Sequence, residues 1–215
     1  FNASLGTAEQ DGTKAVAVKQ LRNEGIIISG EEHALAFGVD LSAYPHISMF
    51  AMDALVNVLE YDYLYEKIRV EGGAYTCGAE YFDNYLLLYS KRDPDIGRTY
   101  EVFKSVPEWL ETVEFTQADV MQQTEGVAER FELLNRTKGE ILSSAIFRTM
   151  NNIKEESVPK VLKLMTDVKL EEVKAIVPLL KEAFENSVVC AVSDEEEIKR
   201  NASLFDEIID LRMGK

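Results

Sequence analysis

The chain has 215 residues, 46% hydrophobic and 28% charged, a composition typical of a globular protein with a substantial core. Its 38 acidic and 23 basic side chains give a formal charge of -15, which repels nucleic acid and anionic membrane and favours neutral or cationic partners. Because the sequence also has no apolar run of membrane-spanning length and no signal-peptide segment, we expect a cytoplasmic protein without nucleic-acid or membrane partners.

The first part of the chain predicts a short linker, a pair of strands and a long helix. Residues 1–21 have a polar composition that predicts a linker or boundary segment, and residues 22–215 contain no further linker. Apolar runs at residues 26–29 and 34–39 predict a strand pair with a short connection. From residue 46 to residue 71, apolar side chains recur every three or four positions, which predicts an amphipathic helix.

Two glycines end that helix and reverse the chain. After Gly72 and Gly73, residues 75–80 and 85–90 predict a hairpin of two strands around a tight turn. Because Arg69 falls in the last helical turn and Tyr75 begins the hairpin, we expect both side chains at one edge of the domain.

The second half of the chain is mostly helical. Pro107 predicts a break in the first of these helices, Thr116 and Asp119 resemble a capping box, and Asp194 predicts the cap of the last helix. The predicted segments are a helix at 96–113, two or three helices within 117–165, a helix at 170–185, a strand at 187–192 and a helix at 195–211. This order predicts a single α+β domain with a mostly antiparallel sheet and helices packed on one face.

No metal or disulfide framework is predicted. His33 and His46 lack the spacing of a metal-binding motif and are expected to be ordinary surface or loop histidines. Cys77 and Cys190 lie on predicted strands and are most simply buried core residues, although the sequence leaves a bridge between them open.

Considered alone, Arg69 and Tyr75 also have ordinary structural interpretations. Arg69 could be a cation that meets the negative end of a helix, and Tyr75 a strand aromatic packed against helices. Tyr61, Tyr63 and Tyr65 alternate along the helix, so they cannot all lie in the core.

The surrounding residues favour a functional interpretation. The heptapeptide Arg69-Val70-Glu71-Gly72-Gly73-Ala74-Tyr75 and the later Arg92-Asp93-Pro94 resemble signatures in the C-terminal half of insulinase/pitrilysin-type zinc metallopeptidases. The resemblance is to the presequence protease and falcilysin branch, and it covers residues 22–212 at the level of pattern.

The resemblance implies a LuxS/MPP-like clamshell half that closes on an N-terminal half around short, unfolded peptides. It implies that zinc is bound by the N-terminal half, whether in the same protein or a partner subunit, with no metal in this chain. Arg69 and Tyr75 would be catalytic and would bind peptide together with Gly73 and Ala74. On its own this chain would then be inactive. The alternative is an inactive scaffold or interaction subunit of the same fold.

Overall fold

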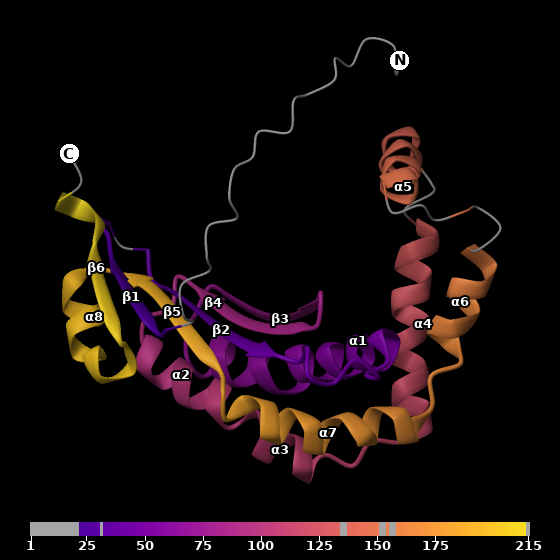
Figure 1. Ribbon diagram of the computed structural model, residues 1–215, viewed down its shortest axis with the longest axis horizontal. Helices are drawn as coiled ribbons and strands as arrows, with labels where there is room; N and C mark the ends of the chain where they lie inside the picture. Colours follow the sequence, from indigo (N-terminus) through magenta and orange to yellow (C-terminus); the bar gives the residue numbers. More distant parts are fainter. Residues whose placement is uncertain (1–21, 31, 134–136, 151–153, 155–157, 214–215) are drawn as a thin grey trace.

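The computed structural model describes residues 22–213 except 31, 134–136, 151–153 and 155–157 (Figure 1). Residues 1–21, predicted as a linker, lie outside the described residues. The strands are β1 (Glu24–Ile27), β2 (Ala34–Asp40), β3 (Thr76–Phe82), β4 (Tyr85–Lys91), β5 (Val188–Ser193) and β6 (Glu207–Asp210). The α-helices are α1 (Met49–Val58), α2 (Ile96–Lys104), α3 (Val106–Thr112), α4 (Gln117–Leu133), α5 (Lys138–Met150), α6 (Val158–Thr166), α7 (Leu170–Phe184) and α8 (Glu195–Arg200). A π-helix, η2 (Leu59–Val70), follows α1, and short 3-10 turns are η4 (Ala202–Leu204) and η5 (Leu211–Met213).

The described strands form one mixed sheet in the order β3-β4-β2-β5-β1-β6. The three pairings from β3 to β5 are antiparallel, whereas β1 runs parallel to both β5 and β6. The predicted α+β class with a mostly antiparallel sheet is confirmed.

Two sequence-based expectations about the sheet were wrong. The predicted pair of β1 and β2 does not form, because β5 lies between these strands and hydrogen-bonds to both. The predicted helix at 195–211 ends at Arg200, and the chain then returns as β6 alongside β1. Ile208 and Ile209 are β-branched residues, which favour a strand, although the predicted helix included them.

Phe37 marks the centre of the hydrophobic core. Its ring lies on the helix-covered face of β2, with ring centroids 5.6 to 6.0 Å from those of Tyr100 and Phe103 on α2 and Phe184 on α7. Figure 1 shows α1, α2, α3 and α7 on this side of the sheet. On the opposite face, alternate residues such as Ala36 and Leu87 are half-buried. The helices therefore pack on one face, as predicted.

The long helix predicted at 46–71 is confirmed, but its second half has an unexpected geometry. Ser48 caps α1 by accepting a hydrogen bond from the backbone N–H of Ala51. After Val58 the backbone continues as η2, and the π spacing persists at its end, where the N–H of Glu71 donates to the carbonyl oxygen of Glu66, 2.9 Å away.

The predicted hairpin is confirmed. A two-residue turn joins β3 to β4, and Asp83 and Asn84 have φ of 48° and 65°, the left-handed conformation that tight hairpin turns require.

The helix predicted at 96–113 is broken, as expected: α2 ends at Lys104 and Pro107 lies in the first turn of α3. The predicted capping box before α4 also forms.

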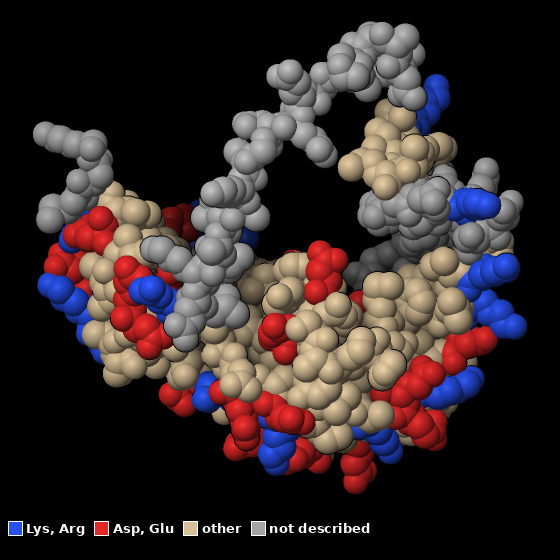
Figure 2. All heavy atoms as spheres, in the orientation of Figure 1, with Lys and Arg blue, Asp and Glu red and all other residues tan. Residues whose placement is uncertain are grey.

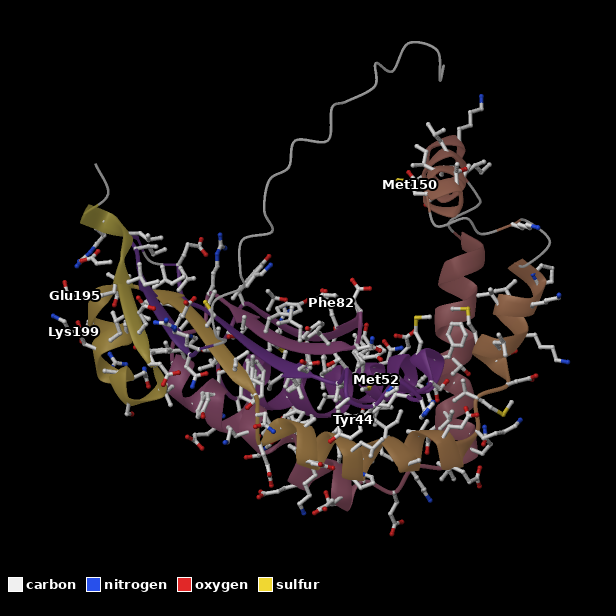
Figure 3. All side chains as sticks on the ribbon, in the orientation of Figure 1. Tyr44, Met52, Phe82, Met150, Glu195 and Lys199 are labelled. Atoms are coloured by element: carbon white, nitrogen blue, oxygen red, sulfur yellow. The ribbon has the colours of Figure 1, made fainter. Side chains whose placement is uncertain are left out.

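The helices that follow extend away from the sheet. α4 packs against α1 and α6, whereas α5 stands clear of the sheet beyond the end of α4 in Figure 1. Figure 3 places Met150, the last residue of α5, far from Phe82 at the end of β3. Charged side chains gather along the helical underside in Figure 2, and an uncharged surface extends over α1.

Candidate functional site

The site predicted from the sequence lies where η2 ends and the hairpin begins. Gly73 has a φ of 80°, a conformation that strains residues with a side chain. Its N–H donates to the carbonyl oxygen of Arg69 at 3.1 Å, and the N–H of Ala74 donates to that of Ile68 at 3.1 Å. These two hydrogen bonds end the π-helix η2 and turn the chain toward β3.

Arg98 of α2 fixes the same helix end from outside. Its Nη1 donates to the carbonyl oxygen of Lys67 at 3.0 Å, and its Nη2 donates to Glu71 Oε2 at 3.2 Å. A cation at this position also opposes the negative end of the helix. A Cβ on Gly72 would collide with Arg98 and the carbonyl oxygen of Ile68, so Gly72 must lack a side chain here.

Tyr75 is 63% exposed, with its backbone held in place. Its N–H donates to the carbonyl oxygen of Arg92 at 3.2 Å. The guanidinium carbon of Arg69 lies 5.9 Å from the centroid of the Tyr75 ring and 5.5 Å from that of Tyr65. The structure therefore brings Arg69 and Tyr75 together at the surface.

A second guanidinium, which the sequence did not predict at the site, also lies over Tyr75. The guanidinium carbon of Arg92 is 5.2 Å from the ring centroid, and Arg92 Nε is 3.6 Å from Glu32 Oε1. Arg92 adopts a φ of 48°, so its backbone curls the chain back beside Tyr75. The Arg-Asp-Pro signature was the available signal, but no pattern of spacing predicts this stacking.

A cavity of about 710 Å³ opens beside this cluster, lined by Glu32, His33, Gly73, Arg92, Asp93 and Pro94. His33, expected to be an ordinary loop residue, lies in the loop before β2 and hydrogen-bonds through Nδ1 to Ser193 Oγ. Asp93 is buried, and its Oδ1 accepts a hydrogen bond from the N–H of Asp95. The cavity is therefore lined mainly by residues with polar side chains, and Arg92 in its lining lies over the exposed Tyr75 ring.

The degree of burial of Ala74 and of the tyrosines on η2 limits what each can contribute to a binding site. The side chain of Ala74 is buried, so any contact with a ligand would have to come from its backbone. Of the helix tyrosines, Tyr63 is buried and stacks on Trp109, whereas Tyr61 and Tyr65 are exposed.

The part of the chain that the structure describes has no group of three or more His, Cys, Asp or Glu residues suited to a metal ion, so these residues do not fit a zinc site.

Cys77 is buried, as predicted, and its thiol donates to the carbonyl oxygen of Leu64. Burial raises the pKa of this thiol to about 11. Cys190 is only half-buried, contrary to expectation, and both cysteines are free.

Chemically, the cluster offers a phenol O–H and two guanidinium groups at the surface of an acidic protein. A phenol can donate one hydrogen bond to an oxygen atom, and a guanidinium can bind a carboxylate or carbonyl group through several N–H donors. The arrangement suits recognition of peptide oxygens.

The mixed sheet, the helices on one face and the helix-to-hairpin reversal form a fold that is similar to solved structures of peptidase M16 and M16-like domains. The structure of a peptidase M16 inactive domain from Pseudomonas fluorescens has a TM-score of 0.59 to this chain, with 13% identity, covering 80% of this chain and 43% of that one. More specifically, the model of the PreP C-terminal domain matches residues 48–195, and the chain belongs to this family.

Curated relatives are much longer than this chain. Protein HypA of Clostridium perfringens is 27% identical over 87% of this chain, which covers 19% of that protein. The mitochondrial presequence protease of Yarrowia lipolytica is 27% identical over 62% of this chain, which covers 13% of its length. The chain thus spans less than a fifth of these relatives. Within the described residues, no helix has the length and apolar character needed to cross a membrane.

Proposed function

We propose that this chain is the C-terminal, substrate-contacting domain of a presequence-protease-like zinc metallopeptidase that cleaves short, unfolded peptides. The observation that supports the proposal is the exposed pair of Arg69 and Tyr75 at the reversal between η2 and β3, within a PreP C-terminal domain. Zinc would be held by the N-terminal half of the protein or by a partner subunit, because the described residues do not fit a zinc site.

The roles of the two side chains follow from their chemistry. The phenol O–H of Tyr75 would donate a hydrogen bond to the carbonyl oxygen of the scissile peptide bond as that oxygen gains negative charge. The guanidinium of Arg69 would bind a neighbouring carbonyl or carboxylate oxygen and hold the peptide in place. Among the described residues Arg69 has no ion pair, so its charge is available to a ligand. Gly73 and Ala74 would contact the peptide through their backbones.

The test uses the full-length protein in which this chain is the C-terminal part. Tyr75→Phe should lower kcat about 100-fold, because it removes one donor to the developing oxyanion and leaves the ring in place. The matched control is Tyr61→Phe, at a tyrosine 61% exposed on η2, which should leave kcat unchanged. Arg69→Ala should lower kcat/KM for the same peptides, with Lys174→Ala on α7 as its control. Wild-type rates in both site variants would exclude these roles.

A second candidate function is an inactive scaffold or interaction subunit, which the similarity to an inactive M16 domain favours. The two candidates differ in the rest of the polypeptide. An enzyme requires His-x-x-Glu-His in the part that precedes Phe1 or in a partner, whereas a scaffold does not. The cytoplasmic location stays a prediction, since presequence proteases similar to this chain are named as mitochondrial.

A further inference from the structure

The strand β3, which follows Tyr75, is an edge of the sheet. Among the described strands its only neighbour is β4. The two-residue turn makes Phe82 and Tyr85 the first hydrogen-bonded pair, so Phe82, Glu80 and Gly78 bond to β4. The intervening residues Cys77, Ala79 and Tyr81 therefore direct their backbone N–H and C=O groups away from β4.

These outward-facing N–H and C=O groups make few hydrogen bonds within the described part of the chain. Among the described residues, the hydrogen bond that these groups make on that side runs from the N–H of Ala79 to Glu60 Oε2, at 3.5 Å the limit of hydrogen-bonding distance. Such an edge can accept a further strand.

A groove follows the same edge. A cavity of about 460 Å³ lies between α1 and the second half of β3, lined by Asp53, Val56, Asn57, Ala79, Glu80, Tyr81 and Phe82. Among the described residues, the lining contains two carboxylates and no basic side chain, and Glu60 adds a further carboxylate beside Ala79. Phe82, at the hairpin end of the groove, is 49% exposed (Figure 3). The groove thus combines unpaired backbone groups, an acidic wall and an apolar end.

We propose that this groove binds an extended peptide segment as a strand added to β3, with lysine or arginine side chains directed at Glu60 on the helix-covered face and at Glu80 on the other face. The proposal rests on the proposed function for the assignment of a peptide as ligand. Because β3 begins directly after Tyr75, a peptide paired with this edge runs toward Tyr75 and Arg69. The seven residues of β3 span about 20 Å, enough for a segment of about six residues.

The charge requirement is tested by direct binding to the 215-residue chain, measured by fluorescence anisotropy. The probe is a labelled extended peptide of about ten residues that alternates valine and lysine. A second, otherwise identical peptide carries norleucine in place of lysine. The lysine peptide should bind at least about tenfold more tightly, and Glu80→Gln combined with Glu60→Gln should remove this advantage. The control, Glu101→Gln combined with Glu108→Gln on α2 and α3, should retain it. Equal affinity for the two peptides, or no binding of either, would overturn the proposal.

The strand pairing is tested with two N-methylated versions of the lysine peptide. Each carries methyl groups on alternate backbone amides, in opposite registers, so one blocks the amides that face β3 and the other blocks those that face solvent. One version should lose about tenfold in affinity and the other should bind almost normally. Equal effects in both registers would exclude strand addition. This readout needs no hydrolysis, so its failure leaves the roles of Arg69 and Tyr75 standing, and their failure in the kinetic test leaves this result standing.

Discussion

Arg98 of α2 donates a hydrogen bond from Nη1 to the carbonyl oxygen of Lys67, 3.0 Å away, and so joins α2 to the end of η2. The residue two positions after Lys67 is Arg69, and the glycine pair follows. The position of the candidate site therefore depends on a side chain that does not itself belong to it.

The first prediction concerns this anchor. Arg98→Ala should lower the free energy of unfolding by about 1 kcal/mol, because it removes a charged donor from a partly exposed helix end. Lys104→Ala, at the other end of α2, should change it by less than about 0.5 kcal/mol. Urea unfolding of both variants measures the difference, and equal values would show that Arg98 does not anchor η2.

The second prediction concerns the left-handed backbone at Gly73. Gly73→Ala should destabilise the domain by about 1 to 2 kcal/mol, because a residue with a Cβ is strained at a φ of 80°. Gly38 of β2 is the matched control. A Cβ there would meet Val188 Cγ2 at 3.6 Å, an ordinary contact, so Gly38→Ala should be neutral or slightly stabilising. Thermal unfolding compares the two, and tolerance of Gly73→Ala would contradict the observed turn.

The third prediction separates the backbone of Arg92 from its side chain. Arg92→Asn and Arg92→Val both remove the guanidinium over Tyr75, but asparagine tolerates a φ of 48° and valine does not. Arg92→Val should therefore be less stable than Arg92→Asn by about 1 kcal/mol in chemical denaturation. If the two variants are equally stable, the conformation of this turn does not constrain the residue.

The fourth prediction concerns pH. Burial raises the pKa of Cys77 from its ordinary value of 9.0 to about 11, so the folded state retains the thiol proton to higher pH than the unfolded chain. The resulting stabilisation is complete below about pH 9 and is lost as the pH rises toward 11. Wild type should therefore lose stability relative to Cys77→Ala as the pH rises from about 9 to about 10.5. A constant difference between the two proteins across this range, measured by urea unfolding, would argue against a buried neutral thiol.

Much of the fold could be predicted because local patterns determine it. Apolar spacing indicates the long helix, the tight turn at Asp83 and Asn84 indicates the hairpin, and Thr116 with Asp119 indicates the start of α4. The insertion of β5 between β1 and β2 could not be predicted, because strand order depends on contacts between distant segments. Asp194 predicts the start of the last helix correctly, but it carries no information about where that helix ends, and pairing with β1 makes Ile208 part of a strand.

The candidate site was predicted only in part, for a related reason. Arg69 and Tyr75 could be placed together because one short reversal separates them. The stacking of Arg92 on Tyr75 and the bond from Arg98 to Lys67 join segments whose proximity only the folded chain reveals. The π geometry of η2 was also missed, because apolar spacing does not record which backbone groups bond.

The twelve residues of η2 make the location of Arg69 sensitive to the length of the chain as well as to its sequence. Removing one residue from this segment would favour ordinary α-helical spacing and rotate the two ends relative to each other by about 100°. Either Arg69 would swing away from Tyr75, or Leu64 and Ile68 would leave the interior. A single-codon deletion here would therefore do more damage to the pairing than many substitutions, even with the heptapeptide intact.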